Sequence, residues 1–211
     1  MSLSRADLFA GFATFFAAPL EQEDVAALRA DGRLGCLGAL LQRPVCRPPL
    51  QRACTVLAGF ADTPTATSRL NAAFCRLFLG TGGPQGTVPP CESAWRGTGG
   101  RLFQEPTAEM ATLLATHGLA VAAECCEPPD HLAIELSLMA ALLAAPDPDA
   151  TAVAALRERL LGWVPRFAAA CTTCDPPGFY AALATLLHLF LLQEDAAACA
   201  GSEHVHEEMG A

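Results

Sequence analysis

Two short groups of residues in this sequence carry side chains that could do chemistry. The first is Glu127-Pro128-Pro129-Asp130-His131, in which two carboxylates accompany an imidazole. In a catalytic interpretation His131 is a general base that Glu127 or Glu135 orients, but the sequence offers no convincing nucleophile. In a structural interpretation Asp130 caps the helix that follows, and His131 bonds Glu135 or a nearby carbonyl group. The residue types favour the structural interpretation. Of the two functional interpretations, they favour ligand binding over catalysis.

The second group is Cys171-Thr172-Thr173-Cys174, whose spacing suits a redox pair or half of a zinc site. The remaining ligands would be Cys125, Cys126 or the pair His204 and His206. No second cysteine pair has this spacing and no strand pattern precedes it, so a metal-binding or redox protein is the alternative function. Most of the ten cysteines lie in apolar helical stretches, which indicates a reduced, cytoplasmic protein.

Composition excludes several other classes of protein. The thirteen basic residues are all arginine, which rules out a Walker lysine, a Schiff-base lysine and a lysine general base. The net charge of −9 repels nucleic acid and attracts cationic partners. The glycine-rich run at 80–86 lacks the ending of a phosphate loop. The stretch Leu8 to Leu20 has too little positive charge for a secretion signal, and no apolar run is long enough for a membrane span.

Helices must position these groups. Hydrophobic residues make up 52% of the chain, much of it alanine, whereas Val, Ile and Tyr are scarce, which favours helix over sheet. A loop with no helical period runs from Gly80 to Gly100. Helical patterns bounded by Pro and Gly are predicted at 4–18, 21–31, 34–42, 49–61, 66–79, 104–118, 131–143, 150–171 and 177–198. The sequence therefore predicts an all-α fold, a bundle of about nine to eleven helices.

We expect a single all-helical domain, residues 1–211, made of two tightly packed lobes. The N-terminal lobe covers about residues 1–126, a Pro-rich hinge about 126–130, the C-terminal lobe about 131–198, and an acidic tail 199–211. Two adjacent prolines stiffen the hinge, and a strained hinge can either block or favour the exchange of lobes between two copies. A monomer and a domain-swapped homodimer both stay open.

Several motifs occur together in one order along the chain. They are Phe74-Cys75-Arg76-Leu77-Phe78-Leu79-Gly80, then Pro89-Pro90-Cys91-Glu92-Ser93-Ala94-Trp95, then Glu127 to His131 with Glu135, Leu136 and Met139, then Trp163 with Phe167, and finally Phe179-Tyr180 with Leu183. This set resembles the TorD/DmsD/NarJ family of molybdoenzyme maturation chaperones, and the E-P-x-D-H signature is most similar to the TorD/DmsD branch. The resemblance covers about residues 66–195.

The resemblance implies a cytoplasmic chaperone with no catalytic activity and no cofactor of its own. It would bind the twin-arginine signal peptide of a molybdopterin-dependent reductase, of the dimethyl sulfoxide or trimethylamine N-oxide type. It would also hold the apo-form of the catalytic subunit back from export until the molybdenum cofactor is loaded. Neither nucleic acid nor a membrane span has a part in this function.

The resemblance also implies which residues bind the signal peptide. The apolar part of the peptide would lie in a groove lined by Phe74, Leu77 and Phe78. The mouth of that groove would be completed by Pro90, Trp95, Pro128, Asp130 and His131. Because an arginine fork pairs well with a carboxylate, Asp130, Glu127 and Glu92 are the candidates to receive the basic end of the peptide.

Overall fold

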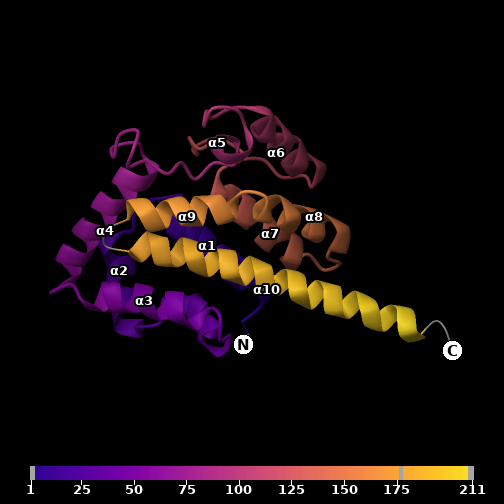
Figure 1. Ribbon diagram of the computed structural model, residues 1–211, viewed down its shortest axis with the longest axis horizontal. Coiled ribbons are helices and arrows are strands. Elements are labelled where there is room, and N and C mark those ends of the chain that lie inside the picture. Colours follow the sequence, from indigo (N-terminus) through magenta and orange to yellow (C-terminus); the bar gives the residue numbers. More distant parts are fainter. Residues whose placement is uncertain (1–2, 176–177, 209–211) are drawn as a thin grey trace.

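Helices are the only extended regular elements in the part of the chain that the computed structural model describes, residues 3–175 and 178–208 (Figure 1). Side chains are described as far as Glu194. The elements are α1 (Arg5–Ala17), α2 (Gln22–Asp31), the 3-10 helix η1 (Gly35–Gln42), α3 (Arg47–Ala58), α4 (Thr63–Phe78), α5 (Ser93–Arg96), α6 (Glu105–Thr116), α7 (Leu132–Ala144), α8 (Ala150–Leu161), α9 (Val164–Cys174) and α10 (Phe179–Glu208). Over these described residues, the predicted all-α fold and its number of helices are confirmed.

The predicted single helix at 150–171 is wrong, because the chain breaks between α8 and α9. Gly162 ends α8, and its N–H donates to the carbonyl groups of Glu158 and Arg159. Trp163 then leaves helical geometry at φ −139°, and Pro165 stands in the first turn of α9, where its missing N–H costs no hydrogen bond. The break matters because it turns Trp163 into the interior, where it is fully buried.

One hydrophobic core is shared by helices from both ends of the chain. α1 packs along α7, and α10 packs between α9 and α3. Figure 1 shows α9 and α10 side by side, with α5 and α6 on the opposite side of α9 from α10. Several aromatic rings of the hydrophobic core meet around Phe78, which is in contact with Phe16, Phe74, Phe167 and Tyr180. The two predicted lobes therefore contribute to the same core.

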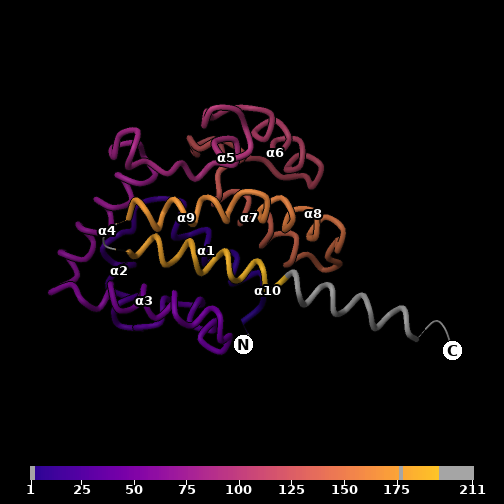
Figure 2. Tube along the Cα trace, viewed as in Figure 1, coloured from indigo at the N-terminus to yellow at the C-terminus, as the bar shows by residue number. Residues whose placement is uncertain are grey.

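Two further expectations concern the acidic tail and a membrane-spanning helix. The acidic tail predicted at 199–211 lies outside the residues whose side chains are described, which Figure 2 draws in colour. Within residues 3–175 and 178–208, none of the helices combines the length and the apolar character that crossing a bilayer requires.

Candidate functional site

The chain before α5 pairs with the chain before α7. Cys91 and His131 form an isolated antiparallel bridge. On one side of it, the N–H of Leu132 donates to the carbonyl oxygen of Pro90 at 2.7 Å. On the other side, the N–H of Glu92 donates to the carbonyl oxygen of Asp130 at 2.9 Å. This pairing brings two of the motifs of the sequence into direct contact. We refer to residues 90–93 and 130–132 as the paired segments.

Asp130 and His131 have roles that differ from the predicted ones. The Oδ2 of Asp130 accepts a hydrogen bond from the N–H of Ser93 at 2.8 Å, so this carboxylate joins the paired segments and does not cap α7. The cap is His131, whose Nδ1 accepts from the N–H of Ala133 at 3.2 Å. Its backbone is extended, at φ −73° and ψ 136°, whereas α7 begins one residue later. The predicted cap was therefore wrong by one residue.

The imidazole of His131 is almost completely buried. Burial lowers its pKa from the usual 6.5 to about 4, despite the opposing charge of Asp130. A neutral ring suits a cap, because the unprotonated Nδ1 can accept a hydrogen bond. The Nε2 lies 3.8 Å from Oε2 of Glu127. The carboxylate of Glu135 accepts from the indole of Trp163 and not from the imidazole of His131, so the predicted side-chain pairing was wrong.

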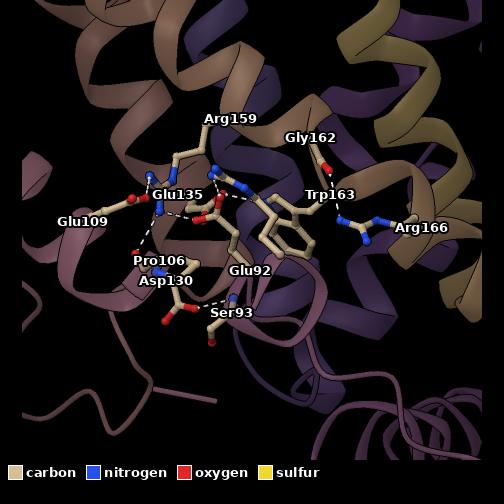
Figure 3. Close-up of polar contacts among 11 residues, drawn as sticks. Glu92, Ser93, Pro106, Glu109, Asp130, Glu135, Arg159, Gly162, Trp163 and Arg166 are labelled. Atoms are coloured by element: carbon tan, nitrogen blue, oxygen red, sulfur yellow. Dashed lines mark hydrogen bonds and ion pairs between the residues drawn. The ribbon is translucent and has the colours of Figure 1, made fainter. Parts of the chain in front are cut away.

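A buried group of charged residues connects the paired segments to α6 and α8 (Figure 3). Glu92 is fully buried, and its Oε1 pairs with Nη1 of Arg96 at 2.6 Å. Its other carboxylate oxygen pairs with Arg159. Arg159 also binds Glu109 at 2.8 Å and the carbonyl oxygen of Pro106 at 2.8 Å. One guanidinium group therefore holds three separate stretches of chain together.

Glu135 is the second carboxylate of this buried group. Its Oε2 accepts a hydrogen bond from the indole Nε1 of Trp163 at 3.1 Å, as Figure 3 shows. Burial raises the pKa of Glu135 well above its usual 4.5, and the negative charge of Glu92 raises it further. The positive charge of Arg159 and the bond from Trp163 act in the opposite direction. The arrangement is that of an ion-pair network in which the carboxylates of Glu92 and Glu135 are buried and only Arg96 and Glu109, at its edge, are exposed.

The residues predicted to line an apolar groove are core residues here. Phe74, Leu77 and Phe78 are all buried. The ring of Phe78 stacks on that of Phe167 at 6.0 Å between centroids. The half-buried ring of Trp95 meets the same Phe167 edge-on at 6.1 Å. In this structure the three residues thus make packing contacts in the core and do not form the wall of an open groove.

The residues predicted for the mouth lie close together. Pro90, Asp130 and His131 belong to the paired segments, and the carbonyl oxygen of Pro128 accepts from the N–H of His131 at 2.9 Å. All four are buried, and Trp95 is half-buried.

The three candidate carboxylates differ in exposure. Glu92 and Asp130 are buried, and Glu92 is already bound to two arginines. The side chain of Glu127 keeps 37% exposure. Among the three, Glu127 is the carboxylate that an external guanidinium group can reach.

The cysteine pair does not form part of a metal centre in the described chain. Cys171 and Cys174 both lie on α9, where burial raises the pKa of the Cys171 thiol. Among the described residues, no group of three or more His, Cys, Asp or Glu side chains could hold a metal ion. His204 and His206, the predicted partners in the tail, lie outside the described side chains.

Arg159 and the role of Glu135 as partner of Trp163 were not predicted from the sequence. In the sequence Arg159 looks like any solvated residue of an amphipathic helix, because its carboxylate partner is remote along the chain. A usable signal existed for Glu135, since this charge interrupts an otherwise apolar helix.

Comparison with known proteins identifies the family. Residues 44–169 match the family model described as nitrate reductase delta subunit. The chain is 31% identical over 209 residues to the chaperone protein TorD of Photobacterium profundum, which covers 94% of this chain and 95% of that protein. It is 34% identical over 190 residues to TorD of Ferrimonas balearica, covering 89% of this chain and 86% of that protein.

A solved structure shows the same fold. It is described as a redox enzyme maturation protein from Archaeoglobus fulgidus, and the match covers 90% of this chain and 96% of that chain with a TM-score of 0.58 at 18% identity. The sequence matches go further than the fold, because they extend over most of the chain at about 30% identity. This chain therefore belongs to the TorD/DmsD/NarJ family of molybdoenzyme maturation chaperones.

Proposed function

We propose that this protein is a cytoplasmic chaperone that binds the twin-arginine signal peptide of a molybdopterin-dependent reductase of the dimethyl sulfoxide or trimethylamine N-oxide type. It binds the apo-form of the catalytic subunit and assists the loading of its molybdenum cofactor before export. The observation that carries the proposal is the 31% identity to a chaperone named TorD over 94% of this chain.

The geometry supports a binding role for the surface around the paired segments. We propose that Pro90, Trp95, Pro128, Asp130 and His131 shape this surface, and that Phe74, Leu77 and Phe78 support it from below. The partly exposed carboxylate of Glu127 borders His131 at 3.8 Å. It is the group best placed to pair with an arginine of the peptide.

We also propose that residues 126–130 are a Pro-rich hinge between two lobes. Exchange of lobes across this hinge would produce a domain-swapped homodimer. Because α1 packs along α7 across that hinge, a swapped homodimer would rebuild this contact between two copies. Light scattering on the full chain, at several concentrations, separates the monomer from the homodimer.

The function is tested by calorimetric titration with twin-arginine leader peptides from the molybdoenzymes of the same organism. We expect saturable binding in the micromolar range or tighter, which corresponds to about −8 kcal/mol or better. A twin-lysine peptide should bind more weakly, because an ammonium group lacks the planar fork of a guanidinium. Folded protein that binds none of these leaders would overturn the proposal.

A further inference from the structure

An apolar groove lies between the end of α6 and one face of α7. Its volume is about 380 Å³. Leu114 of α6 and Leu119 and Val121 of the following connection form one side, and Ile134 and Leu138 of α7 form the other. The groove therefore borders the chain that leads into the Glu127 to His131 motif.

The groove runs along α7 from that motif. Four of its lining residues, Ile134, Ser137, Leu138 and Ala141, follow the spacing i, i+3, i+4, i+7, which places them in one stripe on a helix. Leu138 is buried and forms the floor, whereas Ser137 and Ala141 are exposed at the rim. An open stripe of this kind, one side chain wide, accommodates another helix.

The apolar wall of the groove reaches solvent in the connection after α6. Leu119 is 40% exposed, and Ala120, Ala122 and Cys125 beside it are exposed as well. Exposed apolar groups that line a common depression are typical of a docking site.

The charged residues on the stretch of chain that forms the groove, from α6 through α7, have one sign. Every Asp, Glu, Lys or Arg between Arg101 and Arg157 is acidic, so α6, the connection and α7 contain neither arginine nor lysine. Two of these acids, Glu124 and Glu127, stand on either side of the Cys125–Cys126 pair at the groove. Glu124 is exposed and Glu127 is partly exposed. The groove thus combines an apolar floor with carboxylates near one end.

We infer that this groove binds the hydrophobic segment of the twin-arginine leader as a helix laid along α7, with the arginines paired to Glu124 and Glu127. The inference rests on the proposed function and adds a location that is distinct from the buried Phe74, Leu77 and Phe78. Charge complementarity selects this occupant, because its basic end matches the carboxylates and its apolar segment matches the floor.

A second apolar pocket, of about 300 Å³, is the natural comparison. It lies between α1, α2 and η1, and Asp24, Asp31 and Cys36 are on its wall. The carboxylate of Asp31 already accepts hydrogen bonds from the backbone of Arg33 and Gly35 at 3.1 and 2.9 Å. It is thus less free to receive an arginine than Glu124, which makes this pocket an internal control.

The first experiment places an arginine in the groove. Ala141→Arg adds a bulky cation at an exposed position, and we expect the Kd of the parent leader to rise by about tenfold or more, from steric block and charge repulsion. Ala30→Arg, at an exposed position of α2, is the matched control and should leave the Kd unchanged. Equal Kd values for parent, Ala141→Arg and Ala30→Arg overturn the inference.

The second experiment uses the native thiols as reporters. Cys125 lines the groove and its neighbour Cys126 is also exposed, whereas Cys36 lies in the second pocket. Saturating leader peptide should slow alkylation of Cys125–Cys126 by about fivefold or more without changing that of Cys36, as read by mass spectrometry. Protection of Cys36 alone, or of neither site, overturns the inference.

These outcomes separate the inference from the function on which it rests. Tight leader binding by the parent, with no effect of Ala141→Arg and no protection of Cys125, refutes the groove and leaves the chaperone function standing. No leader binding by the folded parent refutes the function, and the groove assignment with it. A circular dichroism spectrum of Ala141→Arg equal to that of the parent shows that the variant is folded.

Discussion

The paired segments and the α6–α7 groove both adjoin the chain at Glu127 to His131. They differ because the paired segments bury polar groups, whereas the groove exposes apolar groups. In the paired segments, polar groups are buried and bonded within the protein: Asp130 joins one segment to Ser93 of the other, and Glu92 pairs with Arg159 of α8. In the groove, apolar groups such as Leu119 remain open to solvent, and the charges nearby are carboxylates.

This difference indicates what each region contributes. Buried polar groups that already have partners stabilise one arrangement of the chain, and their loss leaves a charge or a donor without compensation. Open apolar groups contribute little to folding and retain surface for a partner. Substitutions in the paired segments should therefore lower the stability in addition to any effect on the proposed binding surface, whereas substitutions in the groove should change mainly the binding of the leader.

The largest effect is expected from Arg159→Met. This change leaves Glu92 and Glu135 buried near each other without the cation that α8 supplies, and should lower the free energy of unfolding by about 3–5 kcal/mol. Urea denaturation followed by circular dichroism measures it. Arg166→Met, at an exposed position of α9, should stay within about 0.5 kcal/mol of the parent. A loss below about 1 kcal/mol for Arg159→Met would contradict the role given to this ion pair.

The next effect is a loss of stability in acid that depends on His131. The unfolded chain takes up a proton on this residue as the pH falls through about 6.5, whereas the folded protein does so only near pH 4. The free energy of unfolding should therefore fall with decreasing pH in that window, by up to about 1.4 kcal/mol per pH unit. His131→Asn keeps a capping acceptor and removes the titration. Its urea curves at pH 7 and pH 5 should differ by less than those of the parent, and an unchanged difference would refute the assignment.

The pH dependence of stability that Glu135 contributes should have the opposite sign to that of His131. Because its pKa is raised in the folded protein, the folded state retains a proton that the unfolded state has lost above about pH 4.5, and stability falls as the pH rises through the raised pKa. Glu135→Gln keeps an acceptor for Trp163 and cannot ionise. The variant should gain stability relative to the parent as the pH is raised from 5 to 8. A stability difference that does not vary over this range would show that Glu135 does not titrate as described.

The smallest effect on stability, with a clear effect on binding, is expected from Leu119→Ser. Because Leu119 is 40% exposed, the free energy of unfolding should change by less than about 0.5 kcal/mol. Its remaining surface is covered when the leader binds, so the Kd should rise about threefold. Leu192→Ser on α10, where the side chain is 45% exposed, is the control and should change neither quantity. A larger effect on unfolding than on binding would remove the distinction between the two regions.

The sequence predicted more of the fold than of the site. The order of helices followed from apolar patterns and from Pro and Gly, and the prediction at 150–171 was wrong because the chain leaves the helix at Gly162 and Trp163. The motif Glu127 to His131 drew attention to the correct turn, but Asp is a preferred N-cap residue and His is not, so the sequence favoured Asp130 over the observed cap His131. Which of them faces the helix depends on Ser93, which lies in another segment.

The sequence by itself determined most of the helices, several of their N-caps and the family. Ser4, Asp62 and Asp149 cap their helices as their residue types indicate, because a cap bonds only to residues two or three positions away. The tertiary structure alone decided that Phe78 is buried, that Glu92 is neutralised by Arg159, and that Leu119 lines an open groove. Those outcomes depend on which helices meet, and burial and ion pairing between remote segments leave no local pattern in the chain.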